Sequence, residues 1–340
     1  MKLLLHIGPH KTGSTSVQLS LSKVRKALLE QGVWYFEPKI AATSAIFAQY
    51  ASKEQRLAPG LLRKFANEDA ILAWSRQCLV DLRAQAARGD ADLCIISSED
   101  FLSLTPDKVA ELLRDMQEIF SEVTVLAYAR DPVALYLSVL QQMVKTGFQL
   151  RQLKTPETFN FPLRRGLETY GRVLGRPRMI VRNFDRANLV QGDVVQDFAA
   201  VVGKIGPTIT LPSLRQNESL PGAATAWFLT VNETWDRGPL GLDRLRVMNT
   251  MTSSKALAAL PRLEMNDPGA QSVIRRNARA DIAWINAAHL QGQIPLAEVE
   301  AADDPTGDQT YTLDWMRDWI MGYLTSDAMA LIAREILRVT

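Results

Sequence analysis

The sequence contains few of the residues on which several classes of protein depend. It has two cysteines, Cys78 and Cys94, and three histidines among 340 residues. Two cysteines are too few for a disulfide framework, and no group of cysteines and histidines has the spacing of metal ligands. We therefore expect both cysteines to be small core residues, and we expect no metal site.

A long apolar run is also missing. No stretch of roughly 18 apolar residues occurs, so the sequence predicts no membrane-spanning helix. The chain starts with Met-Lys-Leu-Leu-Leu. That apolar run is short, and no small-residue cleavage site follows it, as one would in a signal peptide. A cytoplasmic protein is the expectation.

The charges nearly balance. There are 39 Lys and Arg residues against 37 Asp and Glu residues, which gives a formal net charge of +2. So small a charge does not favour binding to nucleic acid or to an anionic membrane surface. Any site for a polyanion must be local. The composition, with 47% hydrophobic and 22% charged residues, is typical of a globular protein.

The first nineteen residues contain a strand, a tight loop and the start of a helix. The apolar run Leu3–Ile7 is followed by Gly8-Pro-His-Lys-Thr-Gly-Ser-Thr15, and apolar residues then recur at helical spacing from about Ser14 to Gln31. The glycines permit backbone angles that are closed to other residues. Such a loop directs N–H groups and the positive end of the helix dipole toward one point, where Lys11 adds a charge. We expect this point to bind an anion.

This loop matches the nucleotide-binding P-loop, Gly-x4-Gly-Lys-Ser/Thr, only in part. The separation of Gly8 and Gly13 is that of the motif, but Ser14 stands where the lysine belongs. Lys11 instead precedes the second glycine by two places. The alternative is an ordinary strand-to-helix turn that contains a lysine.

Polar residues follow two later strands. The run Leu93–Ile96 leads into Ser97-Ser-Glu-Asp100, and the run Val123–Ala129 leads into Arg130-Asp-Pro132. The carboxyl ends of parallel strands carry the ligand site in doubly wound sheets. Arg130 is therefore expected at the same sheet edge as Lys11, and the residues at 97–100 are well placed for chemistry.

The alternation of strands and helices predicts an α/β protein with a P-loop-like, three-layer fold and a central parallel sheet. Two further strands are expected at 33–36 and 178–181, and two surface loops at 40–59 and 147–162. Helical spacing occurs at 61–88, 106–120, 132–144, 163–174 and 194–202.

Beyond residue 207 the sequence changes character, and helices are expected near 224–235, 271–290 and 313–339. We expect a core at 1–210 and a helical C-terminal extension at 211–340, packed together as one structural unit.

The loop at 8–15, taken together with Tyr128-Ala-Arg-Asp-Pro-Val-Ala-Leu-Tyr-Leu-Ser138, resembles two motifs of the sulfotransferases that use 3'-phosphoadenosine 5'-phosphosulfate (PAPS). In that family a lysine-containing relative of the P-loop cradles the 5'-phosphosulfate. An arginine at the end of a later strand and a serine eight places on bind the 3'-phosphate. The resemblance covers roughly residues 1–210 and is sharp at these two motifs.

The resemblance implies a role for each matching residue. The donor's phosphosulfate would be held by Lys11, Thr12, Gly13, Ser14 and Thr15, and its 3'-phosphate by Arg130 and Ser138. The alternative for the last two is an arginine paired with a carboxylate and a serine bonded to its own helix.

The segment Ser98-Glu99 resembles the one that carries the catalytic glutamate in the carbohydrate and heparan-type branch. The glycine-rich phosphate loop near the C-terminus of the cytosolic branch is absent, and Arg215–Ser219 would stand in its place. The sequence therefore resembles a bacterial member of the carbohydrate branch.

The resemblance implies transfer of a sulfuryl group to a hydroxyl acceptor, either a small molecule or a glycan, with no metal. Glu99 is the candidate base, and a partly apolar cleft is expected to raise its pKa toward working pH. Otherwise Glu99 caps its loop or pairs with a surface lysine. His10 is the rival base, whereas His6 is expected in the core.

Two other functions remain open at this point. A kinase that uses ATP with Mg²⁺ is disfavoured by the displaced lysine, and a non-catalytic nucleotide-binding protein is disfavoured by Lys11, Glu99 and Arg130 together. The likeness to the carbohydrate branch implies a carbohydrate or glycolipid acceptor, but no motif indicates which one, nor the oligomeric state.

Overall fold

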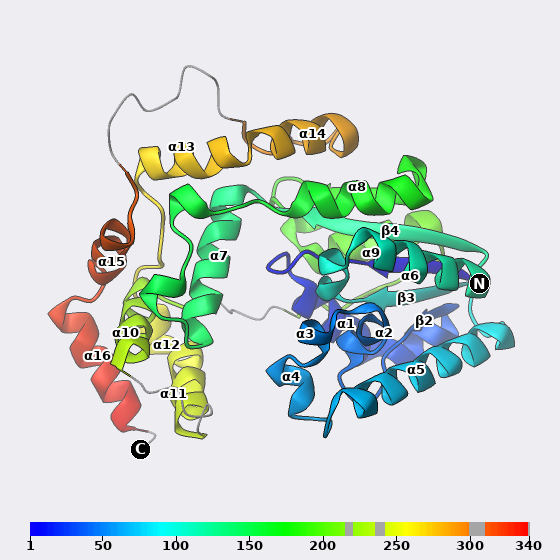
Figure 1. Cartoon of the computed structure of the whole chain (residues 1–340), viewed down its shortest axis with the longest axis horizontal. Helices are drawn as coiled ribbons and strands as arrows, with labels where there is room; N and C mark the ends of the chain where they lie inside the picture. The colour runs from blue at the N-terminus through cyan, green and yellow to red at the C-terminus, as the bar shows by residue number, and fades with distance from the viewer. Residues whose placement is uncertain (215–219, 235–241, 299–309, 339–340) are drawn as a thin grey trace. The chain divides into compact units, whose positions relative to one another are not determined.

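The computed structural model describes residues 1–214, 220–234, 242–298 and 310–338. The chain divides into two compact units (Figure 1). The first unit consists of Met1–Arg130, Pro162–Gln216 and Asp281–Leu296. The second consists of Asp131–Phe161, Asn217–Ala280 and Ala297–Thr340.

The first unit is built on a five-stranded sheet in the order β2-β3-β1-β4-β5, with every pair parallel. Its strands are apolar runs buried on both faces, as parallel strands usually are. Their bounds are Lys2–His6 (β1), Val33–Tyr35 (β2), Leu93–Ser97 (β3), Glu122–Ala129 (β4) and Met179–Asn183 (β5). The predicted α/β fold with a central parallel sheet is confirmed.

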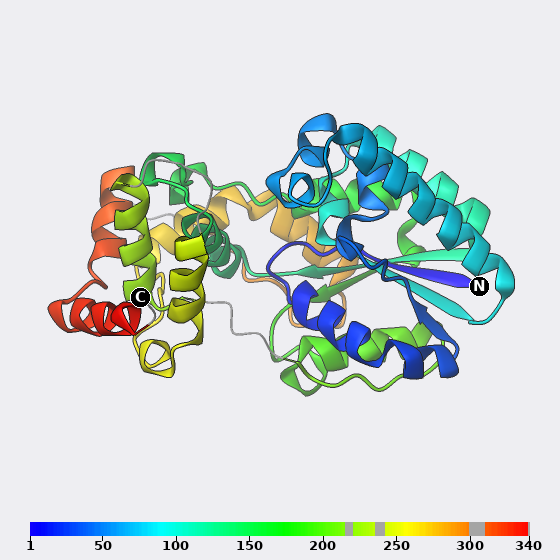
Figure 2. The ribbon, with the colours of Figure 1, turned by 90° about the horizontal axis from the view of Figure 1, so that it is seen from below.

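Helices cover both faces of this sheet, as Figure 2 shows. On one face α1 (Ser14–Glu30) packs beside α9 (Val194–Ile205), and Leu21 and Phe198 are fully buried in the core between these helices and the strands. The other face carries α5 (Glu68–Arg88), α6 (Pro106–Ile119) and α8 (Leu163–Leu174). The first unit also contains α14 (Arg279–His289), together with the short turns η5 (Arg176–Arg178) and η6 (Val190–Gly192). The unit is therefore a three-layer structure.

The strand order places a topological switch point between β1 and β4. From β1 the chain moves to β2 and β3 on one side, and then returns to β4 and β5 on the other. His6 pairs with Ser97 of β3 and with Leu126 of β4, so the segments that follow these strands emerge at one edge. Ligands of open α/β sheets bind at such a point.

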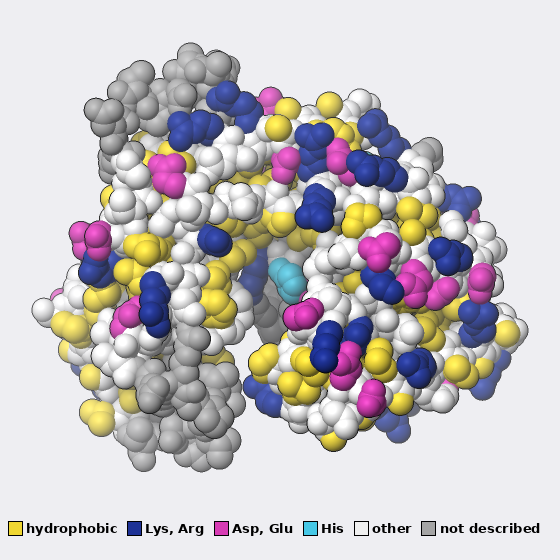
Figure 3. Space-filling model, viewed as in Figure 1, with side chains coloured by type: hydrophobic (Ala, Val, Ile, Leu, Met, Phe, Trp, Pro, Cys, Tyr) yellow, Lys and Arg dark blue, Asp and Glu magenta, His cyan; other side chains and the backbone are white. Residues whose placement is uncertain are grey.

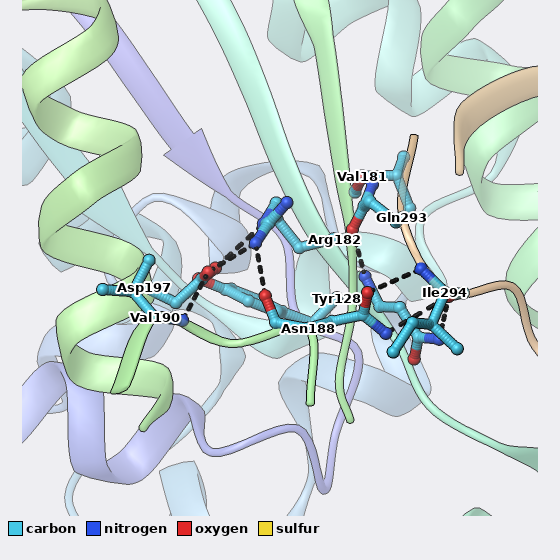
Figure 4. Close-up of polar contacts among 9 residues, drawn as sticks. Tyr128, Val181, Arg182, Asn188, Val190, Asp197, Gln293 and Ile294 are labelled. Atoms are coloured by element: carbon cyan, nitrogen blue, oxygen red, sulfur yellow. Dashed lines mark hydrogen bonds and ion pairs between the residues drawn. The ribbon is translucent and has the colours of Figure 1, made fainter. Parts of the chain in front are cut away.

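A buried ion pair joins β5 to α9 (Figure 4). Arg182 Nη2 lies 2.6 Å from Asp197 Oδ1, and Arg182 Nε donates to Oδ2 at 3.0 Å. The Tyr128 hydroxyl donates to the same Oδ2 at 3.1 Å, and the Asp197 side chain is 1% exposed. A buried carboxylate is tolerable only when it is paired and hydrogen-bonded, so this network fixes the position of α9 on the sheet.

A glutamine side chain covers the outer edge of β5, also seen in Figure 4. Gln293 Oε1 accepts from the backbone N–H of Asn183, and Gln293 Nε2 donates to the Val181 carbonyl, both at 3.0 Å. Asn183 Nδ2 in turn donates to the Ile294 carbonyl at 2.8 Å. These bonds occupy backbone groups that an edge strand would otherwise leave open.

The prediction of a surface loop at 40–59 is wrong. This stretch forms four short helices, and Phe47 and Tyr50 are buried. The Tyr50 hydroxyl donates to Asp115 Oδ2 at 2.6 Å, which ties the segment to α6. A helix of about one turn is too short to show a 3.6-residue period. The helices are Ala42–Ser44 (η1), Phe47–Tyr50 (α2), Lys53–Arg56 (α3) and Pro59–Leu62 (α4).

The second unit is helical in the residues that the structure describes. The helices predicted near 271–290 and 313–339 are each divided in two, at Ala278 and at Gly322–Thr325. Its elements are Pro132–Lys145 (α7), Leu150–Gln152 (η3), Pro156–Thr158 (η4), Gly222–Thr234 (α10), Leu242–Ser253 (α11), Lys255–Ala258 (α12), Pro268–Asn277 (α13), Leu313–Met321 (α15) and Ser326–Leu337 (α16). No helix in the described part of either unit has both the length and the apolar character needed to cross a membrane.

Candidate functional site

The loop between β1 and α1 has the conformation that its glycines suggest. Gly8 and Gly13 have φ of +83° and +78°, and Lys11 also lies in the left-handed region at φ +67°. A Cβ on Gly8 would lie 2.8 Å from the Cβ of Glu99. The loop backbone therefore packs directly on the residue that follows β3, and only glycine fits there.

Helix α1 begins at this loop without a side-chain cap. Gly13 occupies the N-cap position, where it makes no side-chain hydrogen bond. A Cβ at Gly13 would lie 2.7 Å from Val194 Cγ1, so α9 closes the space behind the loop. The first N–H groups of a helix have no partner within the helix. Those of Ser14 and Thr15 are thus positioned to bind an anion, together with the helix dipole.

Arg130 reaches this loop from the end of β4. Its Nη1 donates to the carbonyl of Lys11 at 2.6 Å, and its guanidinium lies 5.6 Å from the centre of the Phe184 ring. Lys11 and Arg130 therefore meet at one sheet edge, as predicted. Thr12 supports the loop from within, because its buried hydroxyl donates to the Pro9 carbonyl at 2.7 Å.

His10 projects from the loop between two carboxylates. Its Nδ1 lies 3.6 Å from Glu99 Oε1, and its Nε2 lies 3.3 Å from Asp100 Oδ1. The hydrogen bond to Asp100 and then the one to Glu99 raise the pKa of His10 to about 9. His10 is therefore an imidazolium at neutral pH, although its side chain is 60% exposed and the pair is partly screened by solvent.

The expected rise in the pKa of Glu99 does not occur. Burial does raise it, but the hydrogen bond and charge of His10 outweigh burial, and the pKa falls to about 2. Gln18 of α1 adds to this effect by donating from Nε2 to Glu99 Oε2 at 3.1 Å. The physical reason for the error is that the neighbour of Glu99 is a cation, which sequence position alone does not reveal.

A buried polar chain continues inward from Glu99. Gln18 Nε2 also donates to Ser97 Oγ at 3.2 Å, and Ser97 Oγ lies 2.8 Å from Nδ1 of His6. His6 is fully buried, and burial lowers its pKa to about 4. The prediction that His6 belongs to the core is confirmed. Gln18 is a site residue that the sequence analysis missed, since a glutamine on a helix carries no signal.

The other predicted residues lie elsewhere or outside the described chain. Ser138 lies on α7 in the second unit, whereas Arg130 belongs to the first, so a joint role for them stays a prediction. Asp131 caps α7: its Oδ1 accepts from the N–H groups of Val133 and Ala134 at 3.0 Å. Arg215–Ser219, the suggested substitute for a third phosphate contact, lies outside the described residues.

Charges of both signs are interspersed on the surface of the first unit. In Figure 3 the Lys and Arg side chains lie among Asp and Glu side chains over the visible face of this unit, without a broad patch of one sign. On this face, therefore, there is no broad positive patch that would suit a polyanion.

Comparison with known proteins finds a likeness among solved structures but not among family models or curated proteins. No family model matches the chain, and no curated protein matches it. Among solved structures, the crystal structure of a sulfotransferase from Alicyclobacillus acidocaldarius aligns with 67% of this chain and 91% of its own, at 18% identity and a TM-score of 0.37.

Proposed function

We propose that this protein is a sulfotransferase that moves a sulfuryl group from PAPS to a hydroxyl acceptor. The observation that carries the proposal is the hydrogen bond between Arg130 and the Lys11 carbonyl, at 2.6 Å. It brings an anion-binding loop and a strand-end arginine to one sheet edge, with Glu99 packed against the same loop. Sulfuryl transfer to a hydroxyl needs a cradle for the leaving phosphate and a proton acceptor, and a cation at the same edge suits recognition of the donor's second phosphate.

Lys11 and the loop are proposed to hold the 5'-phosphosulfate. As the bond from sulfur to the bridging oxygen breaks, negative charge grows on that oxygen and on the phosphate. Preorganised donors stabilise such charge, and one good donor is worth about 3 kcal/mol in the transition state. Lys11 would supply a full charge, and Thr12, Gly13, Ser14 and Thr15 would supply backbone N–H groups. No metal is needed in this scheme.

Arg130 is proposed to bind the 3'-phosphate, with Ser138 as its hydroxyl partner. A guanidinium offers several donors in a planar fork, which suits a phosphate monoester. One of these donors is used on the Lys11 carbonyl. Arg130 would thus connect the two ends of the donor, because the residue that binds one phosphate also fixes the loop that binds the other.

Glu99 is proposed to accept the proton of the attacking hydroxyl. With a pKa of about 2 it is a weak base while His10 lies beside it. An acceptor that enters between His10 and Glu99 would remove the interactions with His10, which are the largest of those that lower this pKa. Burial, which raises it, would remain. His10 holds a proton of its own at neutral pH, so it is the poorer candidate for the base in this arrangement.

The acceptor is proposed to be a carbohydrate or glycolipid. This part of the proposal follows from the likeness of Ser98-Glu99 to the glutamate segment of the carbohydrate branch. No observation favours the alternatives of an ATP-dependent kinase or a non-catalytic nucleotide-binding protein, and both are distinguished by experiment.

The proposal is tested by following label from ³⁵S-labelled PAPS into a panel of sugars and glycolipids, separated by chromatography. Transfer by the wild-type protein is expected, with a loss of at least about 100-fold in Glu99→Gln if the carboxylate is the base. A matched substitution at exposed Glu118, on α6, should leave the rate unchanged. Binding of adenosine 3',5'-bisphosphate without transfer to any acceptor would instead indicate a non-catalytic protein.

A further inference from the structure

The short helices at 42–62 line an open cavity close to Glu99. Its volume is about 420 Å³, and η2 (Glu99–Ser103) forms one wall. Small-molecule sites commonly have volumes of roughly 300–1,000 Å³. The cavity lies entirely within the first unit. No residue of the two sequence motifs is among those that line it.

One wall of the cavity is formed by the residue that follows the proposed base in sequence. Asp100 lines it, and Asp100 Oδ1 lies 3.3 Å from Nε2 of His10 in the anion-binding loop. Glu99 is the neighbouring residue in η2, and the other ring nitrogen of His10 faces it. His10 therefore links Asp100 in the cavity wall to the carboxylate of Glu99.

The lining has the mixed chemistry of a sugar site. Phe47 and Leu61, which are 5% and 6% exposed, supply apolar surface. Hydroxyl, amide and charged groups surround them, contributed by Thr43, Ser44, Gln55, Lys64, Asp100 and Ser103. A hexose has an apolar ring face and a rim of hydroxyls, so it can satisfy both kinds of surface. A purely apolar acceptor would leave the polar groups unpaired, at a cost for each.

Hydrogen bonds hold the polar walls in place. Gln55 Nε2 donates to Ser103 Oγ at 2.9 Å, which joins α3 to η2. Ser103 Oγ donates in turn to the Asp100 carbonyl at 2.7 Å. Gln55 is itself fixed by a capping box with Ser52. Walls that are ordered before a ligand binds reduce the entropy cost of binding.

We infer that this cavity is the acceptor site and that it takes one neutral hexose unit, whose reacting hydroxyl extends past Asp100 toward Glu99. That the bound sugar accepts a sulfuryl group rests on the proposed function. The sugar-binding cavity itself is a separate claim about residues 41–64 and 100–103, and it is tested without turnover.

The inference is tested by placing a large side chain at the exposed rim of the cavity, where it occupies the space proposed for the sugar. Ala58 lines the cavity and is exposed, and its φ of −57° and ψ of 141° suit any L-residue, so Ala58→Trp is expected to fold. Ala73, exposed on α5 and outside the lining, gives the matched control Ala73→Trp. Saturation-transfer NMR with D-glucose, D-galactose and N-acetyl-D-glucosamine measures sugar binding. Calorimetry with adenosine 3',5'-bisphosphate measures the donor site in the same samples.

At least one sugar is expected to bind the wild-type protein and Ala73→Trp with equal affinity. The affinity of Ala58→Trp for that sugar should be at least about tenfold lower. The bisphosphate should bind all three alike. Equal sugar binding in the two variants, or no sugar binding to a wild-type protein that binds the bisphosphate, would overturn the inference. Sugar binding that Ala58→Trp removes, in a protein that ignores the bisphosphate, would uphold the cavity and refute the proposed function.

Discussion

His10 Nδ1 lies 3.6 Å from Glu99 Oε1, and this ion pair connects the loop after β1 to the residue after β3. His10 lowers the pKa of Glu99 to about 2 against the effect of burial, while Asp100 first and Glu99 second raise the pKa of His10 to about 9. The pair thus holds Glu99 ionised and His10 protonated across the neutral range. Both groups lie where the proposed reaction would exchange a proton.

The pair has a predictable effect on stability. His10 has a pKa raised from 6.5 to about 9, so its contribution is complete below about 6.5 and is lost as pH rises through 9. Glu99 has a pKa lowered from 4.5 to about 2, so its contribution is complete above about 4.5 and is lost as pH falls through 2. The stabilisation is therefore greatest between about pH 4.5 and 6.5.

Urea unfolding of wild type and His10→Ala at pH 5.5 and 9.5 measures this effect. Because the His10 side chain is 60% exposed, we expect the free energies of unfolding to differ by less than about 1 kcal/mol at pH 5.5. The difference should vanish by pH 9.5. A difference that stays constant between these two pH values would show that His10 acts through packing and not through charge.

Gly8→Ala should destabilise the protein more than a left-handed glycine elsewhere. Gly8 has φ of +83°, and an added Cβ would lie 2.8 Å from Glu99 Cβ. Gly89 is the matched control, because its φ is +71° and a Cβ there would meet nothing within 4 Å. Gly89→Ala should cost about 1 kcal/mol for the backbone conformation alone. Gly8→Ala should exceed that by about 1–3 kcal/mol in urea unfolding, and equal losses would contradict close packing of the loop on Glu99.

Lys11→Ala is expected to lower turnover much more than donor affinity. Its charge matters most as negative charge develops on the leaving phosphate, so the loss should fall on kcat, by about 100-fold. Exposed Lys39, replaced by alanine, serves as the control. Steady-state kinetics with PAPS and a transfer acceptor measure both constants, and an unchanged kcat would remove Lys11 from the mechanism.

Arg130→Ala should discriminate between nucleotides. If Arg130 binds the 3'-phosphate, affinity for adenosine 3',5'-bisphosphate should fall by about tenfold or more, while affinity for adenosine 5'-phosphate hardly changes. Its bond to the Lys11 carbonyl also supports the loop, so Arg130→Lys is measured to retain the charge. Equal losses for both nucleotides in calorimetry would mean that Arg130 only holds the loop.

The Asp197 carboxylate should be important for folding. It is 1% exposed and paired with Arg182, so Asp197→Ala leaves a guanidinium without its partner and should cost about 3–5 kcal/mol. Glu168→Ala, which breaks a more exposed pair with Arg164, should cost less than about 1 kcal/mol. Similar losses for the two variants in urea unfolding would contradict the role assigned to the buried pair.

The sequence predicted the elements whose patterns are long or chemically distinctive. The first strand, loop and helix were recognisable because a continuous apolar run gives way to helical spacing across a loop that contains two glycines. Arg130 was placed correctly because it follows a strand that is a long apolar run. Helix α11 (Leu242–Ser253) was not predicted, since its apolar residues form no clear stripe.

The short helices at 42–62 and the charge state of Glu99 could not be predicted either. The former depend on tertiary contacts such as that of Tyr50 with Asp115. The latter depends on His10, which is 89 residues away along the chain and adjacent only in the folded protein.

The most direct test of the central claim is calorimetric titration with adenosine 3',5'-bisphosphate, beside adenosine 5'-phosphate and ATP with Mg²⁺. We predict selective binding of the bisphosphate, unchanged by a chelator, because the loop and Arg130 would each engage one phosphate. Preference for ATP with Mg²⁺ would contradict the proposal and favour a kinase, and failure of all three nucleotides to bind would leave the loop without a nucleotide function.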